Sequence, residues 1–437
     1  MALITNGPRG TGDVLPSESY KWQHIEQTLM EVASLYGFKE IRIPVFEHTE
    51  LFTRSVGDTT DVVQKEMYTF FDKGERSITL RPEGTAGTAR ALLQHGVLND
   101  ALPAKVSYLV SCYRYEKPQA GRLREFHQFG VECFGAESFL ADAEVISLAD
   151  SAFKTLGIRN LELKINSIGC PECRKRYHDA LKAYFDEFKG ELCGTCLDRL
   201  DRNPMRILDC KSPVCKGIAE RSPIILDYLC DDCKQHFEGL KTALTSRGIE
   251  FSIDPRIVRG LDYYTRTVFE FVTTEIGAQG TVCGGGRYDG LTEDMGDKRY
   301  PGLGFGLGLE RLLLLMEAQG CEFPEPNRPA LYIASMGDAA KIKAADICER
   351  LRIEGFYALS DIMNRSVKAQ MKYADKIGAK CTVVIGDSEL ESGEAVLKNM
   401  ATGEQKTVKI ENICNEIYDM QINEALEELE LSADLMK

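Results

Sequence analysis

Hydrophobic residues recur along the chain with two periods, one typical of helices and the other of strands. Between Trp22 and Tyr36 they return every three or four positions, which predicts an amphipathic helix ending at Gly37. At 106–116 and 126–134 apolar and polar residues alternate, which predicts the two arms of an antiparallel hairpin. The same patterns predict a helix over 139–156 and strands over 39–43, 77–80, 161–166 and 267–272.

The predicted hairpin carries polar residues on one face of each arm. Strand periodicity places Arg114 and Glu116 together on the first arm, and Gln128, Gly130 and Glu132 together on the second. Polar groups that face a core are costly unless they are paired, so this pattern indicates a pocket wall. A solvent-facing antiparallel surface is the alternative interpretation.

The stretch RGLDYYTRTVFE at 259–270 has a similar pattern. Alternation predicts that Tyr264, Arg266, Val268 and Glu270 share one strand face. That face is either a second pocket wall or the exposed side of an edge strand.

Two glycine-rich segments follow. Gly284–Gly286 allow close approach of another chain segment or a ligand. From 301 to 308, Leu or Phe alternates with Gly, so one strand face is apolar and the other is bare backbone that a flat ligand ring could contact. Neither a GxGxxG fingerprint nor a GxxxxGK[ST] sequence occurs, so the sequence lacks the Rossmann and P-loop motifs.

The last third of the chain predicts a separate α/β domain. Residues 323–329 are rich in proline and predict a linker. Beyond them, strands at 331–335, 381–385 and 396–399 alternate with helices at 339–354 and 366–377. The domain is predicted to span 330–423, and 424–437 to form an acidic tail.

Composition excludes several classes of protein. The 437 residues are 43% hydrophobic, and no apolar run approaches the ~20 residues that span a bilayer. The net charge of −14 argues against non-specific binding to polyanions. The N-terminal residues lack the pattern of a secretory signal, so we expect a cytoplasmic protein.

Eight of the 15 cysteines lie between Cys170 and Cys233, within a segment at 170–245 that interrupts the main pattern and is predicted to be an insertion. Disulfides are rare in a reducing cytosol, which leaves metal ligands or incidental thiols. By spacing, Cys170, Cys173, Cys193 and Cys196 form one zinc-ribbon-like set, and Cys210, Cys215, Cys230 and Cys233 form a second. One or two structural zinc ions, or unligated thiols, are both consistent with this spacing.

Five segments in a fixed order resemble the histidyl-tRNA synthetase family of class II aminoacyl-tRNA synthetases. They are RPEGT (81–85), YRYEKPQAGRLREFHQFGVE (113–132), RGLDYYTRTVFE (259–270), GGGRYDGL (284–291) and GFGLGLERL (304–312). The resemblance implies an α+β fold, in which a class II core with a six-stranded antiparallel sheet flanked by helices carries an insertion domain and a C-terminal anticodon-binding domain. The implied domains are a catalytic core at 1–169 and 246–322, the insertion at 170–245, the linker at 323–329 and the anticodon-binding domain at 330–423.

The resemblance also implies the reaction and its residues. A homodimer would activate L-histidine with ATP and Mg²⁺ to histidyl-adenylate, then transfer histidine to the terminal adenosine of tRNA(His). The implied catalytic residues are Arg114 and Arg259. The implied histidine-binding residues are Glu83, Thr85, Gln128, Glu132, Arg259, Tyr263, Tyr264 and Tyr288. The implied ATP-binding residues are Arg114, Glu116, Arg122, Phe126 and Arg311. Arg266, Glu270 and the acidic tail receive no role.

Two alternatives have other consequences. A paralogue of the family serves as a non-catalytic regulatory subunit of ATP phosphoribosyltransferase, but that group lacks the C-terminal domain and parts of the motifs found here. An acidic, zinc-stabilised interaction protein would leave the inward-facing carboxylates of the hairpin unexplained.

Overall fold

The computed structural model describes residues 5–57, 60, 62–257, 259, 261–276 and 280–435. The chain divides into two compact units, Met1–Pro324 and Glu325–Lys437. Among the described residues, no helix is both long and apolar enough to span a membrane.

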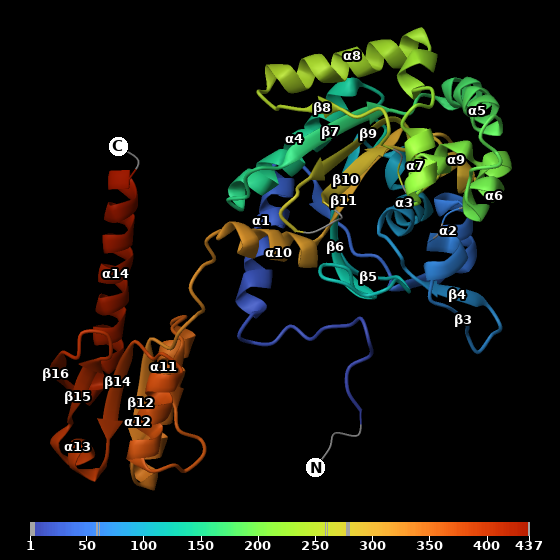
Figure 1. Cartoon of the computed structure of the whole chain (residues 1–437). Helices are drawn as coiled ribbons and strands as arrows, with labels where there is room; N and C mark the ends of the chain where they lie inside the picture. Colours follow the sequence, from blue (N-terminus) through green and yellow to red (C-terminus); the bar gives the residue numbers. More distant parts are fainter. Residues whose placement is uncertain are drawn as a thin grey trace. The chain divides into compact units, whose positions relative to one another are not determined.

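An eight-stranded sheet organises the first unit (Figure 1). Its strands lie in the order β1 (Lys39–Glu40), β5 (Ala104–Tyr113), β6 (Glu125–Phe134), β11 (Gly302–Gly308), β10 (Thr281–Arg287), β9 (Thr265–Val272), β7 (Glu162–Ser167) and β8 (Ser252–Ile253). The six strands from β5 to β7 are antiparallel, as predicted. The predicted total of six is too low, because β1 and β8 each add a short parallel strand at an edge.

The first edge strand is shorter than the predicted 39–43. The carbonyl oxygens of Ile43 and Pro44 accept hydrogen bonds from Nη1 of Arg81, at 2.8 and 2.9 Å. The N–H of Ile41 still donates to the carbonyl of Ser107 on β5, and the carbonyl oxygens of the following Ile43 and Pro44 bond instead to a side chain.

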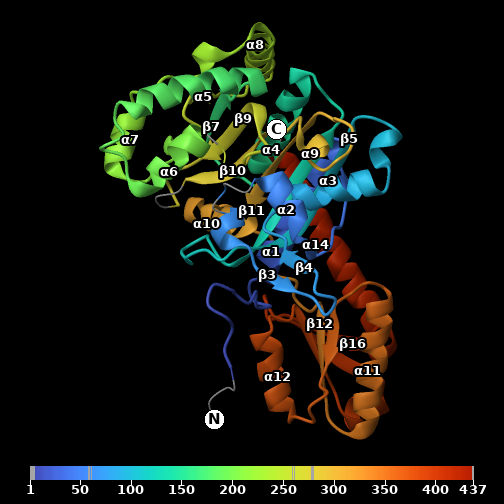
Figure 2. The same ribbon diagram turned by 90° about the vertical axis from the view of Figure 1, so that its right-hand side faces the viewer.

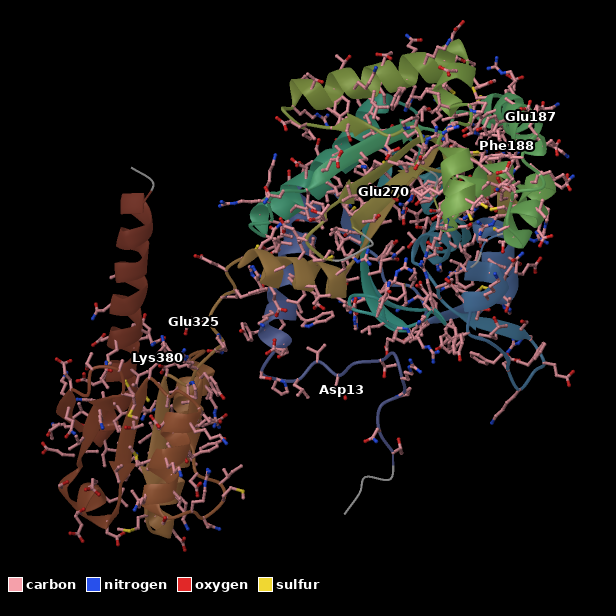
Figure 3. The ribbon with its side chains drawn as sticks, in the orientation of Figure 1. Asp13, Glu187, Phe188, Glu270, Glu325 and Lys380 are labelled. Carbon is pink, nitrogen blue, oxygen red and sulfur yellow. The ribbon has the colours of Figure 1, made fainter. Side chains whose placement is uncertain are left out.

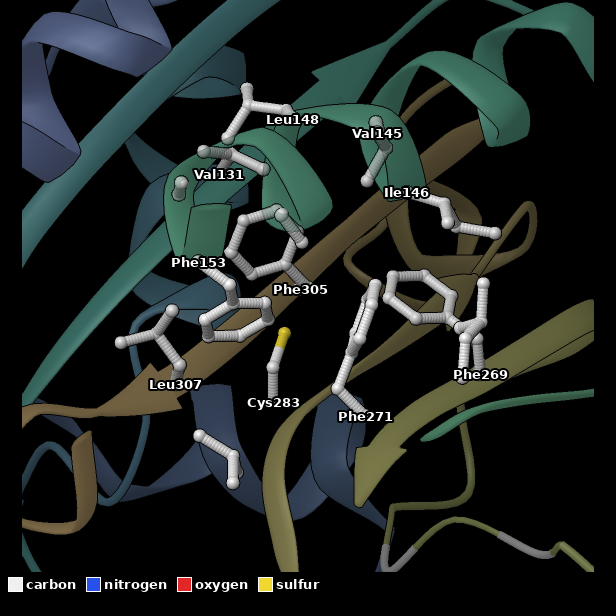
Figure 4. Packing of buried hydrophobic residues seen from close by; sticks show 14 of the residues in the cluster. Val131, Val145, Ile146, Leu148, Phe153, Phe269, Phe271, Cys283, Phe305 and Leu307 are labelled. Atoms are coloured by element: carbon white, nitrogen blue, oxygen red, sulfur yellow. The ribbon is translucent and has the colours of Figure 1, made fainter. Parts of the chain in front are cut away.

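One face of the sheet packs against four helices, α1 (Ser19–Leu35), α4 (Phe139–Thr155), α8 (Asp231–Ser246) and α10 (Leu309–Gln319). Figure 4 shows Phe305 and Leu307 of β11 among the aromatic side chains of β9 and the apolar residues of α4. Leu303, Phe305 and Leu307 are buried in this core, which confirms the apolar face predicted for the alternating glycine segment. Their glycine neighbours therefore face the opposite side of the sheet.

The cysteine-rich segment is helical. It contains α5 (Pro171–Asp186), α6 (Gly194–Arg202), α7 (Pro213–Ala219), and the 3-10 turns η3 (Pro204–Ile207) and η4 (Ile225–Tyr228), followed by α8. Helices α5, α6 and α7 form one group in Figures 1 and 2, whereas α8 contributes Phe237, Leu240 and Leu244 to the core beneath the main sheet. The C-terminal part of the segment is thus packed into the main core.

Smaller elements complete this unit. A three-stranded sheet has the order β2 (Phe46–His48), β4 (Ser77–Leu80) and β3 (Thr69–Phe71). The remaining helical elements are α2 (Thr49–Val56), η1 (Val62–Glu66), α3 (Thr85–Gln94), η2 (Val97–Asn99) and α9 (Leu291–Asp294).

The second unit is an α/β domain around a five-stranded sheet. The strand order is β13 (Ala358–Ser360), β12 (Leu331–Ser335), β14 (Cys381–Ile385), β15 (Glu394–Asn399) and β16 (Gln405–Lys409). Its helical elements are α11 (Asp338–Ile353), α12 (Val367–Lys376), α13 (Asp387–Ser392), η5 (Ile410–Asn412) and α14 (Ile413–Leu435). Helix α14 continues through most of the segment predicted as an acidic tail, and residues 436–437 lie outside the described ones.

Candidate active site

A cavity of about 660 Å³ lies on the glycine side of the main sheet. Most of the residues assigned to histidine, ATP or catalysis line it: Glu83, Thr85, Arg114, Arg122, Phe126, Gln128, Arg259, Tyr263, Tyr264, Tyr288 and Arg311. The other two, Glu116 and Glu132, do not line the cavity but bond to side chains that do. Segments far apart in sequence therefore meet around one cavity.

Glu132 of β6 is completely buried at one end of this cavity. Its Oε1 accepts hydrogen bonds from the hydroxyls of Thr85 at 2.7 Å and Tyr108 at 2.9 Å, and Oε2 accepts one from Tyr288. Burial raises the pKa of this carboxyl well above its ordinary value.

Tyr108 was missed by the sequence analysis, although a signal for it was present. It has the same strand parity as Arg114, on the face predicted to be the pocket wall. Its ring occupies space that a Cβ atom would need at Gly84 and at Gly130, so these two glycines form its slot. Gly130 thus makes room for a side chain of the neighbouring strand, its register partner Tyr108.

The start of α3 gathers three further predicted residues. The carboxylate of Glu83 accepts backbone N–H bonds from Thr85 at 2.7 Å and Ala86 at 2.8 Å. Burial raises the pKa of Glu83, while these donors oppose the shift. Gln128 accepts from the N–H of Gly84 at 3.0 Å. The turn RPEGT therefore positions an acid, a hydroxyl and an amide beside the Glu132 end.

Arg259 lines the cavity and forms an ion pair with Glu270 of β9, which is labelled in Figure 3. Burial lowers the pKa of the guanidinium, but Glu270 together with Tyr264 and Tyr263 outweighs this and raises it, so Arg259 stays charged. Its Nε is buried and has no hydrogen-bond partner among the described residues. An unpaired buried donor is costly unless a ligand satisfies it, so the site suits an anion.

Two structural details explain the position of Arg259. A Cβ atom at Gly284 would collide with its guanidinium, so the glycine run of β10 provides the space. Thr281 donates to Glu270 at 3.1 Å, which holds the partner carboxylate in place. Glu270, which had no role from sequence, is therefore the residue that orients Arg259.

Three further arginines, Arg114, Arg122 and Arg311, line the cavity. Arg122 donates to Glu116 at 2.8 Å, and Arg114 donates through Nε to the carbonyl of Pro82 at 2.8 Å. The guanidinium of Arg114 lies 5.3 Å from the ring centre of Phe126. Arg311 donates to the carbonyl of Thr281 at 2.5 Å. Burial lowers the pKa of Arg311, and repulsion by Arg122 lowers it further.

Three tyrosines form an aromatic wall. The rings of Tyr263 and Tyr264 have centres 4.7 Å apart, and those of Tyr263 and Tyr288 are 5.4 Å apart.

The predicted alternation from Tyr264 to Glu270 is interrupted at Arg266, which has φ of 50° and does not line the cavity. The pairing of β9 with β10 shifts at this point, so Arg266 does not share the predicted face.

The sequence analysis did not identify several charged residues of the wall. Asp209 and Lys211 of the cysteine-rich segment, and Asp254 and Arg256 after β8, also line the cavity. They belong to loops that carry no periodic signal, so only tertiary structure brings them to the site.

The eight cysteines of the helical segment form two groups of four, within each of which the Sγ atoms lie within 4.8 Å of one another. The outer cluster contains Cys170, Cys173, Cys230 and Cys233, and the inner cluster contains Cys193, Cys196, Cys210 and Cys215. The grouping predicted from chain order is therefore wrong. Cys170 and Cys230 immediately precede α5 and α8, and the meeting of these helix starts decides the grouping.

Comparisons with known proteins agree with this architecture. A family model described as "Histidyl-tRNA synthetase" matches residues 10–172 and 220–312, and an "Anticodon binding domain" model matches 330–420. The first model leaves most of the helical cysteine segment unmatched.

Similar proteins cover nearly the whole chain. A "Histidine--tRNA ligase" of Acetivibrio thermocellus is 56% identical over 95% of this chain and 100% of its own length. One of Caldanaerobacter subterraneus subsp. tengcongensis is 56% identical over 94% of this chain and 99% of its own. The crystal structure of apo S. aureus histidyl-tRNA synthetase is 41% identical, has a TM-score of 0.82, and covers 95% of this chain and 100% of its own.

Proposed function

The chain belongs to the histidyl-tRNA synthetase family, and on that premise we propose how its residues attach histidine to tRNA(His). In the first step a carboxylate oxygen of histidine attacks the α-phosphorus of ATP, the bond to the bridging oxygen breaks, and pyrophosphate leaves. In the second step a ribose hydroxyl of the terminal adenosine attacks the carbonyl carbon, gives up its proton, and displaces AMP.

The observation that carries this proposal is the arrangement of groups in one cavity. Glu132 and its hydroxyl partners form a buried group, Arg114, Arg122 and Arg311 form a cationic group, and Arg259 lines the same cavity. A site that binds both a zwitterionic amino acid with a polar ring and, beside it, a triphosphate needs this distribution of groups.

Histidine is assigned to the buried end. Glu132, Tyr264 and Tyr288 contact the imidazole, while Glu83, Thr85 and Gln128 receive the α-amino group and Tyr263 completes the wall. A buried site built to hydrogen-bond a polar ring leaves its own groups unpaired with a wrong amino acid, and such sites reject analogues by about 10⁴-fold.

ATP is assigned to the cationic end. Arg114 and Arg259 face the α-phosphate, where negative charge builds during attack, and act as the catalytic residues. Arg122, Glu116 and Arg311 bind the remaining nucleotide, and the ring of Phe126 stacks on adenine. The carboxylate of Asp209, which lines the cavity, offers the hard oxygen ligand that suits Mg²⁺. When bound with ATP, Mg²⁺ would neutralise part of the phosphate charge.

The remaining assignments concern partners and domains. We assign catalysis to 1–169 and 246–322, the insertion to 170–245, and tRNA anticodon contact to 330–423, with the reaction placed in the cytoplasm where its substrates are.

Phe46 and Phe71 of the small sheet are 55% and 74% exposed, and such apolar exposure supports a homodimer. Sedimentation of the wild type and of Phe71→Asp tests the dimer, and a monomeric wild type would contradict it.

The cysteine-rich segment is assigned structural zinc, because four thiolates at one point are the ligand set that closed zinc sites use.

The regulatory alternative is less well supported. Arg114, Arg259 and Arg311 all line one cavity, and the anticodon-binding model matches the C-terminal unit. A protein retained only for regulation would not require three cations around a nucleotide.

Histidine-dependent exchange of pyrophosphate into ATP tests the proposal, assayed with each of the twenty amino acids. We expect exchange with histidine alone. Folded, metal-loaded protein that shows no exchange would refute the synthetase function and favour the regulatory one.

A further inference from the structure

The sulfur atoms of both clusters have the spacing of metal ligands. In the outer cluster Sγ of Cys170 lies 3.5 Å from that of Cys173 and 4.0 Å from that of Cys230. In the inner cluster Cys193 and Cys210 are 3.9 Å apart. Zn–S bonds of about 2.3 Å in a tetrahedron place sulfurs about 3.8 Å apart, whereas a disulfide needs about 2 Å.

Backbone N–H groups also point at the sulfurs. Cys230 donates to Sγ of Cys173 at 3.1 Å, and Cys193 donates to Sγ of Cys215 at 3.3 Å. Such bonds favour the thiolate form, which is the metal-binding form. In each cluster the bond joins the two halves of the ligand set.

The outer cluster adjoins the strand that forms the aromatic wall. Arg174, next to Cys173, donates to the carbonyl of Tyr264 at 3.0 Å. Gly169, next to Cys170, accepts from the N–H of Arg266 at 2.9 Å. Both ends of the first cysteine pair are thus bonded to the backbone at or beside Tyr264.

The loop that carries the inner cluster bonds to the same segment at its other end. Arg206 and Asn203 lie between the two cysteine pairs of this cluster. They donate to Oδ1 of Asp262 at 2.9 and 3.3 Å. Residues beside or between the cysteines therefore bond to Asp262 and Arg266, the two ends of the segment that contains Tyr263 and Tyr264.

We propose that each cluster binds one zinc ion, and that the outer ion positions Tyr264 and thereby sets the affinity for histidine. The metal sites stand on the thiol geometry alone, whereas the effect on histidine rests on the proposed function. The zinc ions take no part in the chemistry, since neither cluster lines the cavity.

Metal content of pairs of variants tests the grouping. Tag-free, freshly reduced wild type is expected to contain two zinc ions per chain by mass spectrometry. Cys170→Ala with Cys230→Ala, which removes ligands from one cluster, should leave one ion, whereas Cys170→Ala with Cys193→Ala should leave none. Grouping by chain order predicts the reverse. Cys321→Ser, outside both clusters, is the matched control and should keep two.

Cobalt binding by the wild type tests the metal sites without relying on variants that have to fold. Wild type loaded with Co²⁺ should show the absorption of tetrahedral cobalt thiolate, rising linearly to two equivalents. Wild type without stoichiometric zinc and without these bands would overturn the metal sites, whatever the variants do.

Exchange kinetics test the link to histidine. The outer-cluster double variant should raise KM for histidine about tenfold, with a smaller change in KM for ATP, because a displaced wall affects the ligand it contacts. An unchanged KM for histidine in a one-zinc variant would refute the positioning role. Loss of exchange in the two-zinc wild type would instead refute the proposed function, while the metal sites would stand.

Discussion

Two groups of residues at the cavity differ in burial and in charge. In the group proposed to bind histidine (Glu83, Thr85, Tyr108, Glu132, Tyr288) Glu132 is 0% exposed, and its partners are uncharged hydroxyls. In the group proposed to bind ATP (Arg114, Glu116, Arg122, Arg311) the side chain of Arg122 is 39% exposed and pairs with Glu116, while Arg114 and Arg311 donate to backbone carbonyls. A polar ring can be selected by hydrogen-bond geometry in a dry site, whereas a triphosphate is bound by cations that stay hydrated until it arrives.

Arg259 belongs to neither group and is proposed to act at the α-phosphate, so its removal should have the largest effect on pyrophosphate exchange. Arg259→Ala is expected to lower pyrophosphate exchange by about 10³-fold, because a cation aimed at developing charge is lost. Calorimetric affinity for histidine should change much less, since Glu132 and its partners are untouched.

A matched variant separates charge from geometry. Glu270→Gln keeps Arg259 but removes its ionic partner, so exchange should fall less than in Arg259→Ala. Exchange near the wild-type rate in Arg259→Ala would contradict the assigned role.

Gly284→Ala should act on Arg259 without removing it. The new Cβ would collide with the guanidinium, which is the flexible end of a side chain and can move. Misplacement by about 1 Å can lower a rate by about 10²-fold, and we expect a loss of that order in exchange.

The control is Gly308→Ala, where a Cβ meets nothing within 4 Å. It should retain near wild-type exchange. Equal losses in the two variants would show that the loss in Gly284→Ala does not come from displacement of Arg259.

Tyr108→Phe tests the histidine end alone. It removes one hydroxyl bonded to Glu132, a hydrogen bond to a charged or ionisable group worth about 1.5 kcal/mol, so KM for histidine should rise about tenfold. KM for ATP is expected to stay within about twofold. A larger change in KM for ATP than in KM for histidine would contradict the assignment of Tyr108 to the histidine-binding group.

The smallest expected effect is on stability. Because burial raises the pKa of Glu132, its contribution to stability is complete below the ordinary value of 4.5 and is lost as pH rises through the folded value. Glu132→Gln, an isostere of the protonated acid, should therefore gain Tm relative to wild type as pH rises above that ordinary value. A difference in Tm independent of pH, measured by calorimetry without substrates, would show that the carboxyl does not titrate in this range.

Strand periodicity predicted much of the site, because alternation decides which side chains share a face. Gln128 and Glu132 were identified in this way, and so were the bare glycine faces. Periodicity failed where the backbone leaves the regular form, as at Arg266 with its positive φ. It also could not reveal that Glu270 pairs with Arg259, since that contact depends on how a loop folds back on its own strand.

Cysteine spacing had a different limit. The short intervals within each pair predicted metal-type ligands, but they contain no information on which pairs meet. The grouping is decided where the starts of α5 and α8 come together, some sixty residues apart in the chain.

The nested grouping of the cysteines sets an order of assembly during protein synthesis. In the inner cluster the most distant pair, Cys193 and Cys215, is only 22 residues apart, whereas Cys170 and Cys230 of the outer cluster are 60 apart. Closing a shorter loop loses less chain entropy, and Cys215 leaves the ribosome before Cys230. The inner site is therefore complete while the outer one still lacks half of its ligands, and each new chain can fold its insertion from the inside outward.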